Sequence, residues 1–167
     1  MTPTRQERKS LGFRAILVAT IGIICGLACV AAGGATTEWV VVNRHTGLAI
    51  DGFDPVAYFV DGTPTIGIAD LELPFGGVAW RFRNEGNRSA FAAAPSVYAP
   101  RFGGHDPVAM ARGVATAGYP KLWLIAEKRL YFFYSAEART AFSRDPENII
   151  EGAERNWDNV RASLVRN

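Results

Sequence analysis

The alternation of hydrophobic and polar positions divides the chain into an N-terminal segment and a folded part. Residues 15–35 form a run of 21 residues without a charge, and the preceding stretch 5–14 is basic. A bilayer-spanning helix needs about 20 apolar residues, and a basic flank favours the cytoplasmic side. We therefore expect an uncleaved single-pass anchor. The alternative is a cleaved export signal, because the small residues at 31–35 fit a cleavage site.

The rest of the chain begins with extended residues and continues into a short helix. Residues 1–37 are assigned to the basic tail and the membrane or signal segment, 38–46 to a linker, and 47–164 to one folded domain. Asp54 followed by Pro55 predicts a helix start, since an aspartate side chain caps free amides and proline suits the first helical position. This helix must end by Asp61-Gly62.

Two hairpin patterns follow, and each leads into a helix. Strands are expected at 71–75 and 78–83, and again at 122–126 and 129–134. Asn84 and Ser135 are placed to cap the helices that follow. The last helix begins at Asp145-Pro146 and carries an apolar stripe that predicts packing on a sheet: Ile149, Ile150, Ala153, Trp157, Val160 and Leu164. The predicted class is α+β, with two β-hairpins and helices packed on the sheet.

The two halves of the folded part share residues at a fixed spacing. A shift of 51 residues places Leu71 on Leu122 and Phe82 on Phe133, together with Phe91 on Phe142. A shift of 52 lays the sequence Asp-Pro-Val-Ala at 106–109 over the same four residues at 54–57. This pattern predicts an internally duplicated helix–hairpin–helix unit.

Charge and cysteine content exclude several classes of function. The chain has 18 basic and 16 acidic residues, and setting aside four basic and one acidic residue at 5–14 leaves 14 and 15. The folded part has no basic run, so it lacks the electrostatic footprint of nucleic-acid binding. Both cysteines, Cys25 and Cys29, lie in the N-terminal segment. The domain therefore has no disulfide, thiolate ligand or cysteine nucleophile.

The stretch FGGHDPVAMARG at 102–113 is the first candidate site. Gly103 and Gly104 are typical of a tight turn, and Asp106 before a proline is typical of a helix cap. Alternatively, His105 and Asp106 hold a divalent metal ion, which would require two or three further His, Asp or Glu ligands from elsewhere. Both interpretations stay open at the level of sequence.

Candidate catalytic groups are few. No G-x-S-x-G nucleophile elbow or glycine-rich phosphate loop is present. Asp54 and Tyr58 are one helical turn apart, so they form either an acid–base group or a cap beside a packed ring. In the sequence YFFY at 131–134, successive rings point to opposite faces of a strand. One face builds the core, and the other is either exposed to a ligand or partner or covered by the last helix.

Three stretches in order resemble the YHS-domain family in its bacterial exported or membrane-tethered form: AIDGFDPVAYF, VAWRFRNEGNRSAFAAAPSVYAPRFGG and LYFFYSAEARTAFSRDPENIIEGAERNW. The resemblance covers roughly residues 47–158 and implies a small α+β module described as metal-binding. The family typically has an aromatic residue and a cysteine after the Gly-Gly pair, where this chain has His105 and Asp106. Any metal site here would lack the soft thiolate ligand.

We therefore expect a non-enzymatic, extracytoplasmic, YHS-like binding module that handles a metal ion or a small ligand. The loop from Tyr98 to Asp106 is its expected site. The alternative is a membrane-tethered protein-interaction module that uses an aromatic face, and a small enzyme ranks third. The expected location is the bacterial inner membrane, anchored by one N-terminal helix with the domain in the periplasm. Cleavage of the signal would instead give a periplasmic or secreted protein.

Overall fold

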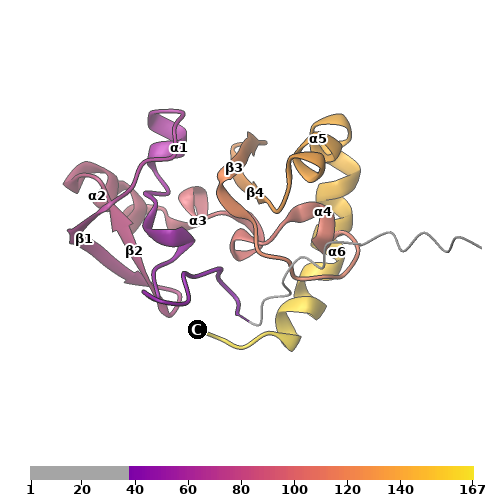
Figure 1. Cartoon of the computed structure of the whole chain (residues 1–167), viewed down its shortest axis with the longest axis horizontal. Helices are drawn as coiled ribbons and strands as arrows, with labels where there is room; N and C mark the ends of the chain where they lie inside the picture. Colours follow the sequence, from indigo (N-terminus) through magenta and orange to yellow (C-terminus); the bar gives the residue numbers. More distant parts are fainter. Residues whose placement is uncertain (1–37) are drawn as a thin grey trace, which may run out of the picture. The chain divides into compact units, whose positions relative to one another are not determined.

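The computed structural model describes residues 38–167, so the predicted anchor or signal helix lies outside the described residues. The first half contains η1 (Ile50–Gly52), α1 (Ala57–Val60), β1 (Ile68–Phe75), β2 (Val78–Phe82), α2 (Glu85–Ala93) and α3 (Pro95–Tyr98). The second half contains η2 (Arg101–Gly104), α4 (Pro107–Met110), β3 (Tyr119–Ala126), β4 (Arg129–Phe133), α5 (Ala136–Arg144) and α6 (Pro146–Ser163). The predicted α+β class with two hairpins is confirmed (Figure 1).

Each hairpin is a separate two-stranded antiparallel sheet with the same irregularity near the start of its first strand. In β1–β2 the register shifts between Ile68 and Glu72, and in β3–β4 it shifts between Tyr119 and Trp123. A glycine precedes each bulge. A Cβ on Gly118 would lie 2.6 Å from the Cβ of Phe132. The strands approach too closely there for any larger residue.

The hydrogen bond that caps α2 in the first half recurs at the start of α5 in the second half, at the predicted spacing. The side chain of Asn84 accepts from the amide of Asn87 at the start of α2, and Ser135 accepts from Ala138 at the start of α5. The predicted caps are confirmed. The α2 helix contacts β1 and β2, whereas α5 contacts β3 and β4 (Figure 1).

The core consists of two clusters that meet at β4. Leu130 and Phe132 belong to the first cluster, which is built mainly from the first half of the domain. Tyr131 and Phe133 belong to the second cluster, built from the second half. Both faces of β4 are therefore buried, because alternate side chains of a strand point in opposite directions. The first cluster, rather than the last helix, covers the Phe132 face.

The last helix, α6, packs mainly against α4, and its predicted apolar stripe joins the core cluster that also contains Tyr131 and Phe133 of β4. Gly152 has no side chain, which lets α6 and α4 approach closely. A Cβ added at Gly152 would lie 3.2 Å from the Cβ of Ala111. Asn156 Nδ2 donates to the carbonyl oxygens of Met110 and Ala111, at 3.3 and 3.0 Å. Since α4 leaves carbonyl groups exposed at its C-terminal end, this amide satisfies them.

Residues 38–42, expected to belong to a linker, are bonded to the domain. The amide of Trp39 donates to Val165 O at 3.1 Å, and the amide of Val41 donates to Gly103 O at 2.8 Å. The amide of Val40 donates to Asn167 Oδ1 at 2.9 Å. Among residues 38–167, no helix combines the length and the hydropathy needed to cross a membrane.

Candidate functional site

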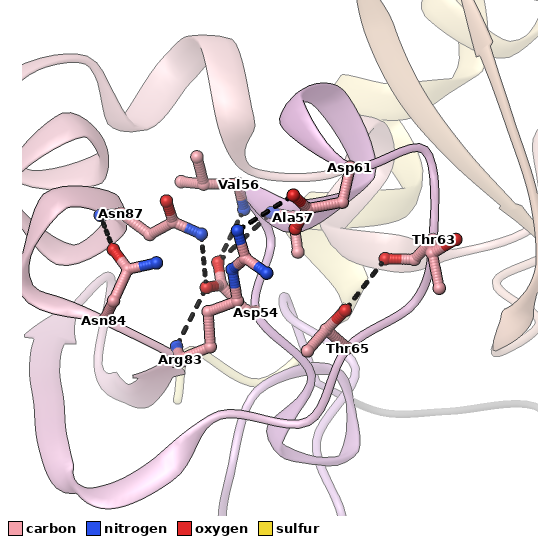
Figure 2. Close-up of polar contacts among 9 residues, drawn as sticks. All are labelled: Asp54, Val56, Ala57, Asp61, Thr63, Thr65, Arg83, Asn84 and Asn87. Atoms are coloured by element: carbon pink, nitrogen blue, oxygen red, sulfur yellow. Dashed lines mark hydrogen bonds and ion pairs between the residues drawn. The ribbon is translucent and has the colours of Figure 1, made fainter.

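Asp54 is fully buried and its carboxylate accepts four hydrogen bonds (Figure 2). Oδ1 accepts from the amides of Val56 at 2.8 Å and Ala57 at 3.3 Å. Oδ2 accepts from the amide of Arg83 at 2.9 Å and from Asn87 Nδ2 at 2.7 Å. Asp54 thus makes the hydrogen bonds expected of a cap, although α1 itself begins only at Ala57. The same carboxylate also connects the start of α1 to the end of β2 and to α2.

Tyr58 is also buried, and it connects the two halves of the domain. Its hydroxyl donates to Pro120 O at 2.9 Å, and its ring lies 5.2 Å from that of Trp123 in an edge-on arrangement. Burial raises the pKa of Tyr58 well above its usual value, and the carboxylates of Asp51 and Asp54 add to this effect. The hydroxyl therefore stays protonated and serves as a hydrogen-bond donor.

Asp106 repeats the arrangement of Asp54 in the second half. It is 2% exposed. Oδ1 accepts from the amides of Val108 at 2.7 Å and Ala109 at 3.3 Å, and Oδ2 accepts from the amide of Tyr134 at 2.8 Å. The predicted cap at this position is confirmed. The carboxylate accepts hydrogen bonds from backbone amides. These bonds explain how the charge is stabilised in the interior with no cation beside it among residues 38–167.

His105 is fully buried, and its Nε2 lies 2.9 Å from Glu38 O. Burial lowers the pKa of His105, while hydrogen bonds to the backbone of Glu38 and Thr116 act in the opposite direction. The neutral imidazole therefore ties the first described residue to the interior. Within residues 38–167, no three or more His, Cys, Asp or Glu side chains are grouped so that they could hold a metal ion.

The remaining candidates serve the turn and the packing around it. Gly103 has φ +63° and Gly104 has φ +88°, the left-handed region that favours glycine. A Cβ on Gly103 would collide with the carbonyl oxygen of Trp39. Tyr98 packs edge-on against Phe59, with ring centroids 5.4 Å apart. These contacts explain the predicted site residues without a ligand.

A pocket of about 190 Å³ lies next to the turn at residues 103–106, and we call it the tyrosine pocket. Tyr119 and Tyr134 form one wall, with rings stacked at 5.6 Å between centroids and 27° between planes. Tyr119 is 52% exposed. Among residues 38–167, the lining consists of Glu38, Val41, Val42, Arg44, Ala117, Tyr119 and Tyr134.

The predicted site residues form hydrogen bonds to the backbone of residues that line the pocket. His105 bonds to the carbonyl oxygen of Glu38, and Asp106 accepts from the amide of Tyr134. The carbonyl oxygen of Gly103 accepts from the amide of Val41. Buried groups with fixed partners thus position residues from two separate segments of the pocket lining.

Polar groups at the rim of the pocket keep their bonding capacity. Within residues 38–167, neither Glu38 nor Arg44 forms an ion pair, although six other arginines do. The hydroxyls of Tyr119 and Tyr134 likewise have no hydrogen bond to the described part of the chain. Among residues 38–167, these four side chains therefore have no polar side-chain partner.

Sequence reasoning missed the pocket because its walls come from distant segments. Tyr119 lies outside the strand expected at 122–126, and residues 38–46 were assigned to a linker rather than to a wall. The one local signal was the position of Tyr134 at the end of an aromatic strand. Comparison of the chain with family models, with curated proteins and with solved structures finds no match in any of the three.

Proposed function

We propose that this chain is a non-enzymatic, extracytoplasmic, YHS-like binding module that holds a small ligand in the tyrosine pocket. The observation that carries the proposal is the pocket itself, which combines stacked aromatic rings, aliphatic side chains and polar side chains that have no partner among residues 38–167. Ligand sites typically combine a mostly apolar lining with a few polar groups that fix orientation.

The rigidity of the pocket walls supports binding. Glu38, Val41 and Tyr134 are each bonded through the backbone to the turn at residues 103–106. A preformed site loses little conformational entropy when a ligand enters, so more of the contact energy appears as affinity. The buried His105 and Asp106 therefore have a positioning role in this proposal, in place of the metal-ligand role that the sequence left open.

The proposed location and history of the module follow from the sequence. The uncharged run at 15–35 favours a single-pass inner-membrane anchor with the domain in the periplasm, and signal cleavage is the alternative. We also propose that the two halves arose by duplication of one helix–hairpin–helix unit. The equivalent caps, bulges and buried aspartates support this history.

A second candidate function is a membrane-tethered protein-interaction module. Of the aromatic side chains at 131–134, first considered for this role, those at 131–133 are buried and Tyr134 is half-buried. The observation in its favour is instead a set of exposed apolar side chains between 37% and 63% exposed: Val60, Ile66, Ile68, Phe75, Val97, Val114, Tyr119, Ile125 and Val165. Where exposed apolar side chains adjoin one another in a large patch, they mark interaction sites.

The test is a thermal-shift screen of the full-length protein in detergent against small metabolites and divalent ions. We expect at least one small metabolite to raise the Tm of the wild type. Tyr119→Ala should abolish the shift, whereas Phe75→Ala, which alters an exposed aromatic residue of the other hairpin, should retain it. A screen in which no metabolite stabilises the protein, or a shift that survives Tyr119→Ala, contradicts the proposal. Co-purification of a stoichiometric protein partner would favour the second candidate.

A further inference from the structure

The tyrosine pocket carries one group of each charge. Glu38 and Arg44 both line it, and neither has an ion pair within residues 38–167. Both come from the same N-terminal stretch, which is held by the bond from His105 to Glu38 O and by the bonds of Asn43 to Leu48 and Asp51. The two charged residues therefore stand on a backbone stretch that is bonded to the rest of the domain.

The rest of the lining is apolar or aromatic. Val41, Val42 and Ala117 supply aliphatic surface, and the stacked rings of Tyr119 and Tyr134 supply a flat wall. The volume of about 190 Å³ is smaller than the roughly 300–1,000 Å³ of sites for drug-sized ligands. The ligand that fits is small, with an apolar group as well as polar ends.

We propose that the tyrosine pocket binds a small zwitterion with an apolar side chain, of the class of free aliphatic or aromatic α-amino acids. This inference rests on the proposed function and names its ligand class. The carboxylate of such a ligand pairs with the Arg44 guanidinium, whose planar fork matches a carboxylate. The ammonium group pairs with Glu38 and lies against the tyrosine rings, and the apolar group rests on Val41 and Val42.

Charge complementarity separates this ligand class from its neighbours. A purely cationic ligand would leave Arg44 unpaired beside a second positive charge, and a purely anionic ligand would do the same to Glu38. Specificity often comes from such unfavourable pairings as much as from the attractive ones. A zwitterion alone satisfies both residues at once.

The experiment is calorimetric titration of the full-length protein in detergent with four probes. These are L-leucine, L-phenylalanine, L-leucinamide, which keeps only the amine charge, and N-acetyl-L-leucine, which keeps only the carboxylate. We expect both amino acids to bind at least tenfold more tightly than either single-charge analogue. Arg44→Gln should weaken L-leucine about tenfold with little effect on L-leucinamide, and Glu38→Gln should weaken L-leucine with little effect on N-acetyl-L-leucine.

Matched controls are available at the far end of the second hairpin. Lys128→Gln and Glu127→Gln remove the same charges from the β3–β4 turn and should leave the affinity for L-leucine unchanged. Equal binding of a single-charge analogue overturns the zwitterion assignment. Failure of all four probes, while another metabolite binds in a Tyr119-dependent manner, overturns the assignment but leaves the proposed function standing. If the metabolite screen also finds nothing, both fall.

Discussion

At the residue scale, two buried carboxylates are stabilised by hydrogen bonds from amides and form no ion pair within residues 38–167. Asp54 and Asp106 each cap the start of a helix through Oδ1. Through Oδ2, each accepts a bond from the backbone amide that follows a β-hairpin, which is Arg83 for Asp54 and Tyr134 for Asp106. Hydrogen bonds to a charged group contribute about 1.5–3 kcal/mol each, and an unsatisfied buried partner costs a similar amount. Each aspartate thus fixes a helix start to a strand end.

We expect Asp106→Asn and Asp54→Asn each to lower the free energy of unfolding by about 2–4 kcal/mol. In each variant, the asparagine NH2 group that replaces one carboxylate oxygen is a donor. It faces backbone N–H donors, so an attractive hydrogen bond is replaced by a repulsive contact. Urea denaturation measures the change. Asp70→Asn, at an exposed position, should stay within about 0.5 kcal/mol of the wild type. A loss at Asp106 that appears only when the wild type is loaded with a divalent ion would instead identify the carboxylate as a ligand.

His105 gives the domain a defined response to acid. Because burial lowers its pKa in the folded state, the unfolded chain binds the proton more readily. The free energy of unfolding is therefore unaffected by this group above the unfolded pKa of about 6.5 and falls as the pH drops below it, by at most about 1.4 kcal/mol per pH unit. His105→Gln should flatten the profile between pH 6.5 and 5. His45→Gln, at the exposed histidine, should retain the wild-type slope, and equal slopes for all three proteins would contradict this account.

The sequence predicted only those roles that depend on residues close by in the chain. The caps at Asp54 and Asp106 depend on amides two and three residues away, so the local pattern predicted them. Their bonds to Arg83 and Tyr134 span 29 and 28 residues and exist only once a hairpin has closed. The bond from Tyr58 to Pro120 was unpredictable for the same reason.

At the element scale, the turn before α4 serves as a docking site for the N-terminal stretch. The carbonyl oxygen of Gly103 accepts from Val41, and Trp39 O lies where a Cβ on Gly103 would be. The hairpins and capped helices were predicted because their signals are local turn and cap residues. The attachment of residues 38–42 was not, since its partners at Gly103, Val165 and Asn167 are more than 60 residues away.

Gly103→Ala separates this docking role from backbone strain. Gly103 and Gly62 have nearly the same φ, +63° and +62°, but nothing lies within 4 Å of a Cβ on Gly62. Both substitutions carry the strain of an alanine at positive φ, of order 1 kcal/mol. Only Gly103→Ala should also displace Trp39, seen as faster hydrogen exchange at the Val41 amide and as a change in tryptophan fluorescence. The same exchange rates in both variants would contradict the contact.

At the scale of the whole domain, β4 makes the two halves one cooperative unit. Its side chains alternate between the first core cluster and the second, so neither cluster is complete without it. The sequence predicted two similar halves but not how they share a strand. Both faces of YFFY are apolar, and periodicity alone does not say what covers each face.

We expect Phe82→Ala in the first cluster and Phe142→Ala in the second each to lower the free energy of unfolding by about 3–5 kcal/mol. Both rings are fully buried. Each variant should still unfold in one transition, with far-UV circular dichroism and tryptophan fluorescence giving the same urea midpoint. A second transition in either variant would show that the halves unfold separately.

The side-chain amide of Asn167 exchanges two hydrogen bonds with the backbone of Val40, at 2.9 and 3.4 Å. The backbone of Asn167 also lies against Gly77 at the tip of the first hairpin. Replacement of Asn167 by alanine would remove both of these hydrogen bonds and loosen the stretch at 38–42, which supplies Glu38, Val41 and Val42 to the lining of the pocket. Variants that change the pocket should therefore keep this asparagine, because its loss alone would disturb the pocket wall.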